Sequence, residues 1–165
     1  MSSTPDLVRV GWREWLALPD LGIPAIKAKI DTGARTSSIH AVNIQTERRD
    51  GRDFAIFDVA PLREHSHFFL HCEAAVVGER EVRSSNGQIS LRLFVRSRIA
   101  LGGHEWPIQL SLADRTNMKF PMLLGRQAMA RHVCVEPWRS YLTGRRLPHV
   151  YRDTRLPKKR KESRS

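Results

Sequence analysis

The sequence predicts an all-β domain with one short helix near the C-terminus. Segments in which apolar and polar residues alternate recur along the chain, and turn-forming residues separate them at short intervals. Helical periodicity is nearly absent from the sequence. A third observation is the sequence Ser84-Ser85-Asn86-Gly87, in which Asn-Gly favours the left-handed backbone of a tight hairpin between two alternating segments.

The expected strands follow one another along the chain. The first spans residues 8–18, which alternate, contain aromatic residues and end at the turn sequence Pro19-Asp20-Leu21-Gly22. The second spans residues 26–30 and brings Asp31 to its end. Further strands are expected at residues 54–59, 68–77, 81–83, 89–95, 99–101 and 106–110, with Gly78 ending the strand at 68–77. Only residues 126–131, which follow Gly125, have a helix-forming composition.

The composition indicates one folded domain with a basic tail. The chain has 165 residues, of which 41% are hydrophobic and 27% charged, as in ordinary folded domains. Lys and Arg number 28 and Asp and Glu 17, which gives a net charge of +11 and favours anionic partners. Residues 155–165 hold six basic residues and one acidic residue. We therefore expect a flexible N-terminus at 1–7, a domain at 8–152 and a basic disordered tail at 153–165, which is a candidate contact to the ribosome.

Targeting and cysteine patterns indicate the compartment. No apolar run is long enough to cross a bilayer, and residues 1–7 lack the basic and apolar parts of a signal peptide. Cys72 and Cys134 lie far apart without a CxxC pattern, which argues against a disulfide framework. We therefore expect a cytoplasmic protein with reduced thiols and no membrane partner.

The strongest candidate for a catalytic site is Asp31-Thr32-Gly33, which follows the apolar strand at 26–30. A carboxylate that must face a second carboxylate across a water needs a close approach of backbones. Gly33 permits this approach because it has no Cβ atom, and the Thr32 hydroxyl can hydrogen-bond to hold the loop in place. Downstream, Leu123-Leu124-Gly125 precedes the expected helix and forms a partner for the loop.

These two motifs resemble the arrangement of retropepsin-type aspartic peptidases, in which the D-T-G loop carries the catalytic acid. More of the chain resembles a bacterial retropepsin-like family that is often labelled "ATP-dependent zinc protease" and includes the RimB type. The similar segments are Trp12-Arg13-Glu14-Trp15 and residues 24–41, 82–87, 101–103, 113–118, 123–126 and 140–144. The resemblance implies a retropepsin-like acid-protease β-barrel, with inserted strands between the two motifs.

The resemblance also implies an aspartic peptidase that trims the glutamate tails which ATP-grasp ligases add to proteins such as ribosomal protein S6. In such an enzyme two carboxylates share one proton, so that one activates a water as a base and the other acts as an acid. The chain contains one D-T-G sequence, so we expect a C2 homodimer in which each copy contributes Asp31. This chemistry needs no metal or other cofactor, and the sequence contains neither HExxH nor GxxxxGK(S/T).

Substrate contacts are expected from one hairpin and from arginines. The turn at Arg83-Ser84-Ser85 lies between the two motifs and is the candidate for a flap that closes over substrate. Guanidinium groups bind carboxylates through two parallel hydrogen bonds, which suits a glutamate-tailed protein or another acidic peptide. The candidate arginines are Arg35, Arg83, Arg115 and Arg126, of which Arg126 is the one expected to brace the dimer interface.

Two alternatives remain open from the sequence. A retropepsin scaffold without a working pair of acids would be a noncatalytic module that binds the ribosome or RNA through its basic surface. A metallopeptidase would instead lose activity in a chelator. His65, His67, His71 and Cys72 form the one cluster that could hold a metal, but a structural zinc takes four ligands at specific spacings, so we favour a solvated loop and expect no metal site.

Overall fold

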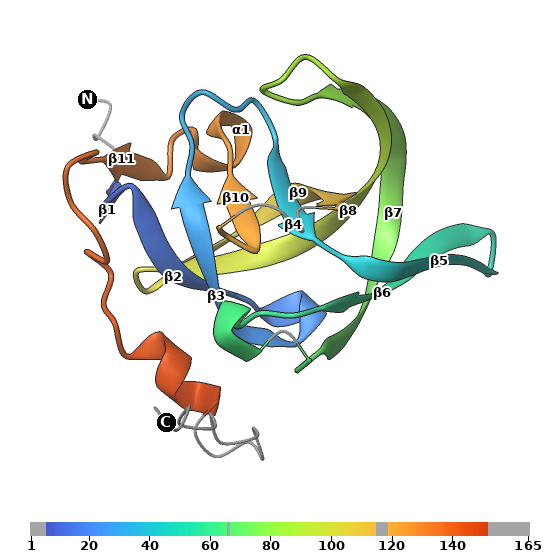
Figure 1. Cartoon of the computed structure of the whole chain (residues 1–165), viewed down its shortest axis with the longest axis horizontal. Coiled ribbons are helices and arrows are strands. Elements are labelled where there is room, and N and C mark those ends of the chain that lie inside the picture. The colour runs from blue at the N-terminus through green and yellow to red at the C-terminus, as the bar shows by residue number, and fades with distance from the viewer. Residues whose placement is uncertain (1–5, 66, 115–118, 152–165) are drawn as a thin grey trace, which may run out of the picture.

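A computed structural model describes residues 6–65, 67–114 and 119–151 of the chain (Figure 1). The described residues are mainly strands, which confirms the predicted all-β class. The strands are β1 (Val8–Val10), β2 (Arg13–Leu18), β3 (Ile23–Ile30), β4 (Ser37–His40), β5 (Val42–Arg49), β6 (Arg52–Val59), β7 (Leu70–Arg83), β8 (Ile89–Leu101), β9 (His104–Ala113), β10 (Met122–Leu124) and β11 (Val133–Val135). The helical elements are α1 (Arg126–Met129) and the 3-10 helices η1 (Pro19–Leu21), η2 (Arg63–His65) and η3 (Leu147–Tyr151). The tail expected at 153–165 lies outside the described residues.

Six of the strands close into a ring. The large sheet has the order β2-β3-β10-β4-β9-β8-β7-β6-β5, and β2 also pairs with β8 through Ala17 and Ala100. This second pairing joins β2, β3, β10, β4, β9 and β8 into a barrel, which removes the free edges of an open sheet. The tip of the β7–β8 hairpin and the whole β5–β6 hairpin extend away from the ring (Figure 1).

Side chains that alternate along the strands fill the barrel. On β2 half-buried and buried residues alternate, and Leu16 and Leu18 are fully buried. Other large, fully buried side chains of this core come from β3, β4, β8, β9 and β10, and they include Ile26, Ile39, Ile99, Leu110, Met122 and Leu124. Burial of each such side chain contributes roughly 1.5–3 kcal/mol. The ring is therefore a firm support for the loop that follows β3.

Two expected strands differ in the structure. Residues 8–18 form two strands because the chain turns at Gly11, where a Cβ atom would lie 2.0 Å from the carbonyl oxygen of Arg139. The first of the two, β1, pairs with β11 in a separate small sheet. Gly78 does not end its strand, since the register shifts between Val76 and Gly78 and β7 continues to Arg83. A bulge of this kind bends a strand without ending it.

A buried carboxylate fastens the start of β2 to the C-terminal segment. Glu14 is fully buried and accepts hydrogen bonds from the backbone N–H groups of Gly11, Leu142 and Thr143 at 2.8, 2.8 and 3.0 Å. The Thr143 hydroxyl donates a fourth bond at 2.7 Å. These donors satisfy a charge whose burial would otherwise be strongly unfavourable.

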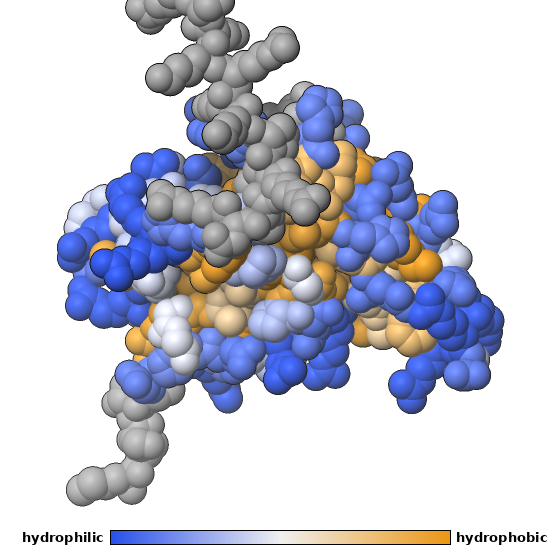
Figure 2. Space-filling model, turned by 90° about the horizontal axis from the view of Figure 1, so that it is seen from below, coloured by the Kyte–Doolittle hydropathy of each residue, from blue (hydrophilic) through white to orange (hydrophobic). Residues whose placement is uncertain are grey.

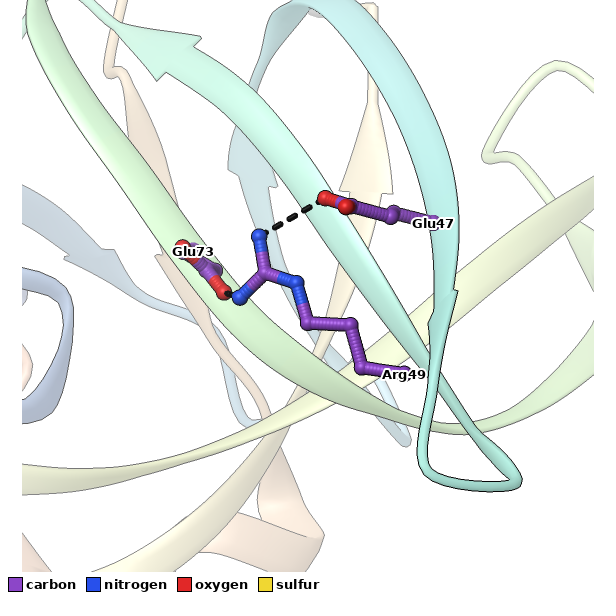
Figure 3. A network of polar contacts seen from close by, with 3 residues as sticks. All are labelled: Glu47, Arg49 and Glu73. Carbon is purple, nitrogen blue, oxygen red and sulfur yellow. Dashed lines mark hydrogen bonds and ion pairs between the residues drawn. The ribbon is translucent and has the colours of Figure 1, made fainter.

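One arginine ties the β5–β6 hairpin to β7. Arg49 donates to Glu47 on its own strand at 2.7 Å and also to Glu73 on β7 (Figure 3). Since β6 lies between β5 and β7, the Arg49 side chain spans the middle strand. Exposed ion pairs add little to stability because water and salt screen them, so this contact helps to fix the hairpin without dominating its stability.

Hydrophobic residues gather in the centre of the face shown in Figure 2, and hydrophilic residues surround them. Over the whole described surface, the large apolar side chains with high exposure include Trp138, Leu91 and Ile89. The helices of the described residues are too short or too polar to cross a membrane.

Candidate active site

The loop that carries Asp31 crosses the end of an inserted strand. β10 lies between β3 and β4, parallel to β3 with Leu124 beside Ile30 and antiparallel to β4. The connection from β3 to β4 therefore passes over the end of β10. The backbone N–H of Asp31 donates to the carbonyl of Leu124 at 2.9 Å, which continues the ladder by one residue. Asp31 is thereby placed at the end of two paired strands.

The carboxylate of Asp31 is held by its own loop. Oδ1 accepts hydrogen bonds from the backbone N–H of Gly33 at 2.9 Å and of Ala34 at 3.2 Å. Oδ2 accepts no hydrogen bond from any described residue, and the side chain is half-buried. A Cβ atom at Gly33 would lie 3.2 Å from Oδ1, so the glycine gives this oxygen its room. The arrangement orients one oxygen and leaves the other available to a water or a second acid.

Gly125 packs directly against the exit of this loop. A Cβ atom there would lie 2.5 Å from the carbonyl carbon and oxygen of Thr36, and the backbone N–H of Gly125 donates to the Ser37 hydroxyl at 2.9 Å. The first residues of α1 continue the contact. Their backbone N–H groups donate to the carbonyls of Ala34 and Arg35 at 2.8 and 3.1 Å. The Leu123-Leu124-Gly125 motif thus buttresses the loop through the backbone.

Of the residues predicted to contact substrate, Arg126 is hydrogen-bonded to the candidate catalytic loop. Arg126 Nη1 donates to the carbonyl of Thr32 at 3.0 Å, while the Thr32 side chain is exposed. Within the described residues, no hydrogen bond or ion pair joins the loop to the candidate flap residues. The candidates without such a bond are Arg83, Ser84 and Ser85, and Arg115 lies outside the described residues.

The candidate flap is a well-formed hairpin tip. The Ser84 N–H donates to the Gln88 carbonyl at 2.8 Å, and the Ser84 hydroxyl bonds to Asn86 and to the same carbonyl. Gly87 has a φ of +85°, as the Asn-Gly pattern predicts. Arg83 and Ser85 are exposed, whereas the Ser84 hydroxyl is used inside the turn. Arg35 is also exposed and leaves its guanidinium open to solvent.

The histidine segment forms local contacts instead of a ligand set. His71 Nδ1 lies 2.6 Å from Asp58 Oδ1, and hydrogen bonds from Asn43 and His71 lower the pKa of Asp58. Cys72 is buried, and burial raises the pKa of its thiol to about 12. The residues that the structure describes contain no group of three or more His, Cys, Asp or Glu side chains that could hold a metal.

A cavity of about 490 Å³ borders the exit of the catalytic loop. It is lined by Thr36 and Ser37 from the loop and β4, by the start of α1, and by side chains of β7, β8 and β9 that include Arg80 and Arg96. The sequence does not predict either arginine, because neither lies within a motif. They fall one residue outside the strands expected on either side of the flap, at 81–83 and 89–95, and the sequence does not give the register of those strands.

Comparisons with known proteins agree with this geometry. The family described as RimB-like, retropepsin-like aspartic endopeptidase RimB, matches residues 9–146. A protein of Shewanella halifaxensis named probable alpha-L-glutamate ligase is 46% identical over 135 residues, which are 82% of this chain and 30% of that protein. A protein of the same name from Desulfotalea psychrophila is 44% identical over 128 residues, or 78% of this chain and 28% of that protein. The chain therefore spans under a third of the length of these relatives. A crystal structure of a Legionella pneumophila protein of unknown function matches with a TM-score of 0.71 and 28% identity, over 82% of this chain and 98% of that one.

Proposed function

Because the chain belongs to the RimB-like family of retropepsin-like aspartic endopeptidases, we propose that it is an aspartic peptidase that hydrolyses glutamate-rich peptides. The observation that carries the proposal is the Asp31 loop. Its carboxylate has one oxygen fixed by two backbone N–H groups and the other open, at the end of a strand pair buttressed by Gly125.

The reaction needs a second acid, and we assign it to Asp31 of a second copy of the chain. The sequence holds one D-T-G triplet, so two copies related by a twofold axis would supply two identical loops. The backbone N–H groups that hold Oδ1 would fix both carboxylates in equivalent orientations. Two carboxylates this close share one proton, because both cannot ionise at low cost.

The chemistry follows from that shared proton. The ionised carboxylate takes a proton from a water held between the pair, and the water attacks the peptide carbonyl. The protonated carboxylate donates to the developing oxyanion, and a proton then passes to the leaving nitrogen. Arg126 supports the geometry by binding the Thr32 carbonyl, which fixes the loop from the side of α1.

Two observations support glutamate as the substrate class. The relatives that share this segment are named as glutamate ligases, and a hydrolase acting on the same product would reverse their chemistry. The net charge of +11 also favours an anionic peptide. We propose protein-attached glutamate tails as the substrate, with the tail of ribosomal protein S6 as the first candidate, and a cytoplasmic location for the enzyme.

The test is mass spectrometry of a glutamate-tailed protein incubated with the wild-type chain or with Asp31→Asn, each with and without a chelator. We expect the wild type to release glutamate with or without chelator, and Asp31→Asn to keep its fold and release none. Undiminished release by Asp31→Asn would refute the aspartic mechanism. Release that a chelator abolishes would indicate a metallopeptidase. Absence of release together with salt-dependent RNA binding would favour the noncatalytic module.

Mixing the two proteins tests the shared site. If each active unit needs two copies of Asp31, an equal mixture of wild type and Asp31→Asn that exchanges subunits should retain about a quarter of the activity of the same total amount of wild type. Independent monomers would retain about half. A value near half, with subunit exchange verified, would show that each copy of the chain is active independently of the other.

A further inference from the structure

The cavity beside the catalytic loop is lined by charged, polar and apolar side chains. Its inner wall is the loop exit at Thr36 and the start of α1, and α1 is held to β9 by a hydrogen bond of 2.8 Å from Trp106 Nε1 to the Ala128 carbonyl. Its outer wall is the stem of the β7–β8 hairpin, which contributes Arg80 and Arg96. The cavity thus lies between the candidate catalytic loop and the base of the candidate flap, where an extended substrate would pass.

Arg80 is oriented before any ligand binds. Its guanidinium lies 4.8 Å from the ring centre of the buried Phe94, and its Nη2 donates to Gln109 Oε1 at 3.1 Å. A guanidinium has five N–H donors, so one bond to Gln109 leaves several for a ligand. A pre-oriented guanidinium loses less conformational entropy when it binds a carboxylate.

The positive charge at this cavity has no acidic partner among the described residues. Three arginines of the described residues, Arg9, Arg49 and Arg98, pair with carboxylates, and Arg98 lies only two positions from Arg96 on β8. Arg80, Arg92 and Arg96 form no ion pair with a carboxylate in the part of the chain that the structure describes. The register places Arg80 directly opposite Arg92 on the adjacent strand. Like charges opposed in this way destabilise a sheet, and a bound anion would relieve the repulsion.

We propose that this cavity is a specificity subsite in which Arg80 and Arg96 bind the side-chain carboxylate of a glutamate residue of the substrate. The inference rests on the proposed function and deepens it, by naming the side chains that select an acidic peptide. The volume falls within the roughly 300–1,000 Å³ of small-ligand sites and accommodates a glutamate side chain with water. Ile108 and Pro107 offer an apolar wall to its methylene groups, and Gln127 and Thr36 offer further polar contacts.

Binding and cleavage are measured separately. Fluorescence anisotropy with a labelled oligoglutamate peptide, in the Asp31→Asn background, reports binding without turnover. We expect Arg80→Gln and Arg96→Gln each to weaken binding about tenfold to a hundredfold, the range for a lost hydrogen bond to a charged group. With Asp31 intact, the same substitutions should lower kcat/KM for oligoglutamate by a similar factor while leaving an oligoglutamine peptide unaffected. Arg80→Lys should give an intermediate loss, because the charge remains and the paired donors do not.

Arg52→Gln is the matched control. It removes one positive charge from the exposed start of β6, and Arg52 does not line the cavity. Binding by this variant should change less than about twofold, since Arg52 is exposed, lies outside the cavity lining and is screened by salt. Thermal unfolding of each variant verifies the fold, which should be kept because Arg80 and Arg96 are exposed.

The outcomes separate the subsite from the peptidase. Oligoglutamate binding that neither Arg80→Gln nor Arg96→Gln weakens would overturn the subsite, even if the wild type cleaves the peptide. Binding that depends on both arginines, in a wild type that never cleaves, would support the subsite and refute the peptidase. A single-stranded RNA that binds more tightly than oligoglutamate and depends on the same arginines would overturn the assignment to a glutamate side chain.

Discussion

A methyl group added at Gly125 would collide with the chain that carries Asp31. The new Cβ atom would lie 2.5 Å from the carbonyl carbon and oxygen of Thr36 and 3.0 Å from the Ala34 carbonyl, whereas ordinary contact begins at 3.4 Å. Both partners are backbone atoms, so the loop must move by about 0.9 Å to accept the methyl group. Overpacking of this kind costs roughly 1–3 kcal/mol, which corresponds to a fall of about 2–12 °C in Tm for a domain of this size.

The Gly125→Ala substitution should reduce the rate of cleavage strongly while the protein remains folded. A displacement of about 1 Å in a catalytic group can lower a rate about a hundredfold. The assay is oligoglutamate cleavage at a temperature well below both melting points, with Tm measured in parallel. Gly51→Ala is the control, because Gly51 has a φ of +79° and open space around it, so its variant loses stability without touching the loop. Wild-type cleavage by Gly125→Ala, or a Tm above that of the wild type, would refute the buttress.

Three further predictions concern stability and reactivity. Glu14→Ala should destabilise the fold by about 3–5 kcal/mol in chemical denaturation, because it leaves four donors without their acceptor, and a loss below about 1 kcal/mol would contradict that role. Maleimide should label the exposed Cys134 of the folded protein and spare Cys72, as mass spectrometry would show. The Cys72 thiol is buried and its pKa is raised, so it is neither accessible nor readily ionised to the reactive thiolate. Equal labelling of the two cysteines would be inconsistent with this packing. A backbone hydrogen bond from Arg98, and then its side chain, lower the pKa of Asp20, so this carboxylate stabilises the fold above its unfolded pKa and loses that effect as pH falls through the lower folded pKa. The difference in Tm between wild type and Asp20→Asn should therefore shrink below about pH 4, and a difference that stays constant with pH would contradict this reasoning.

Short-range patterns predicted the parts of the site that lie within a few residues of one another. Alternation over residues 26–30 predicted the end of β3, where Asp31 stands. The composition of residues 126–131 predicts a helix after Gly125, which is observed over Arg126–Met129 as α1. These signals suffice because strand ends, close glycine contacts and short helices depend on the local sequence.

β4 and β5 could not be predicted from an alternation of apolar and polar residues. β4 begins with Ser37 and Ser38, which are buried although their side chains are polar. The Ser37 hydroxyl accepts from the Gly125 N–H, and the Ser37 carbonyl accepts from the Ser111 hydroxyl, and both bonds exist only once β10 and β9 are in place. β5 was missed for the opposite reason, since it is exposed along nearly its whole length and shows no alternation.

The arginines proposed for substrate illustrate the same limit. Arg35, Arg83, Arg115 and Arg126 are predicted from the sequence because they lie within its motifs. The cavity instead combines Arg80, Arg96 and side chains of β9, which become neighbours only through strand register. Register is set by pairing across the whole sheet, so residues chosen by distance along the chain miss it.

The proposed catalytic and recognition residues lie on partly different strands. Asp31 depends on β3 and β10, which are strands of the closed ring, whereas Arg80 stands on β7, outside that ring. The opposition of Arg80 and Arg92 costs the sheet roughly 0.2–1 kcal/mol, which is less than the roughly 1.5–3 kcal/mol that a hydrogen bond to a charged group can return when an anion binds. Arg80 itself is exposed and lies on β7, so its replacement leaves the packed core in place. Substitutions on β7 can therefore change which side chain is bound while the loop, its buttress and the barrel remain unchanged.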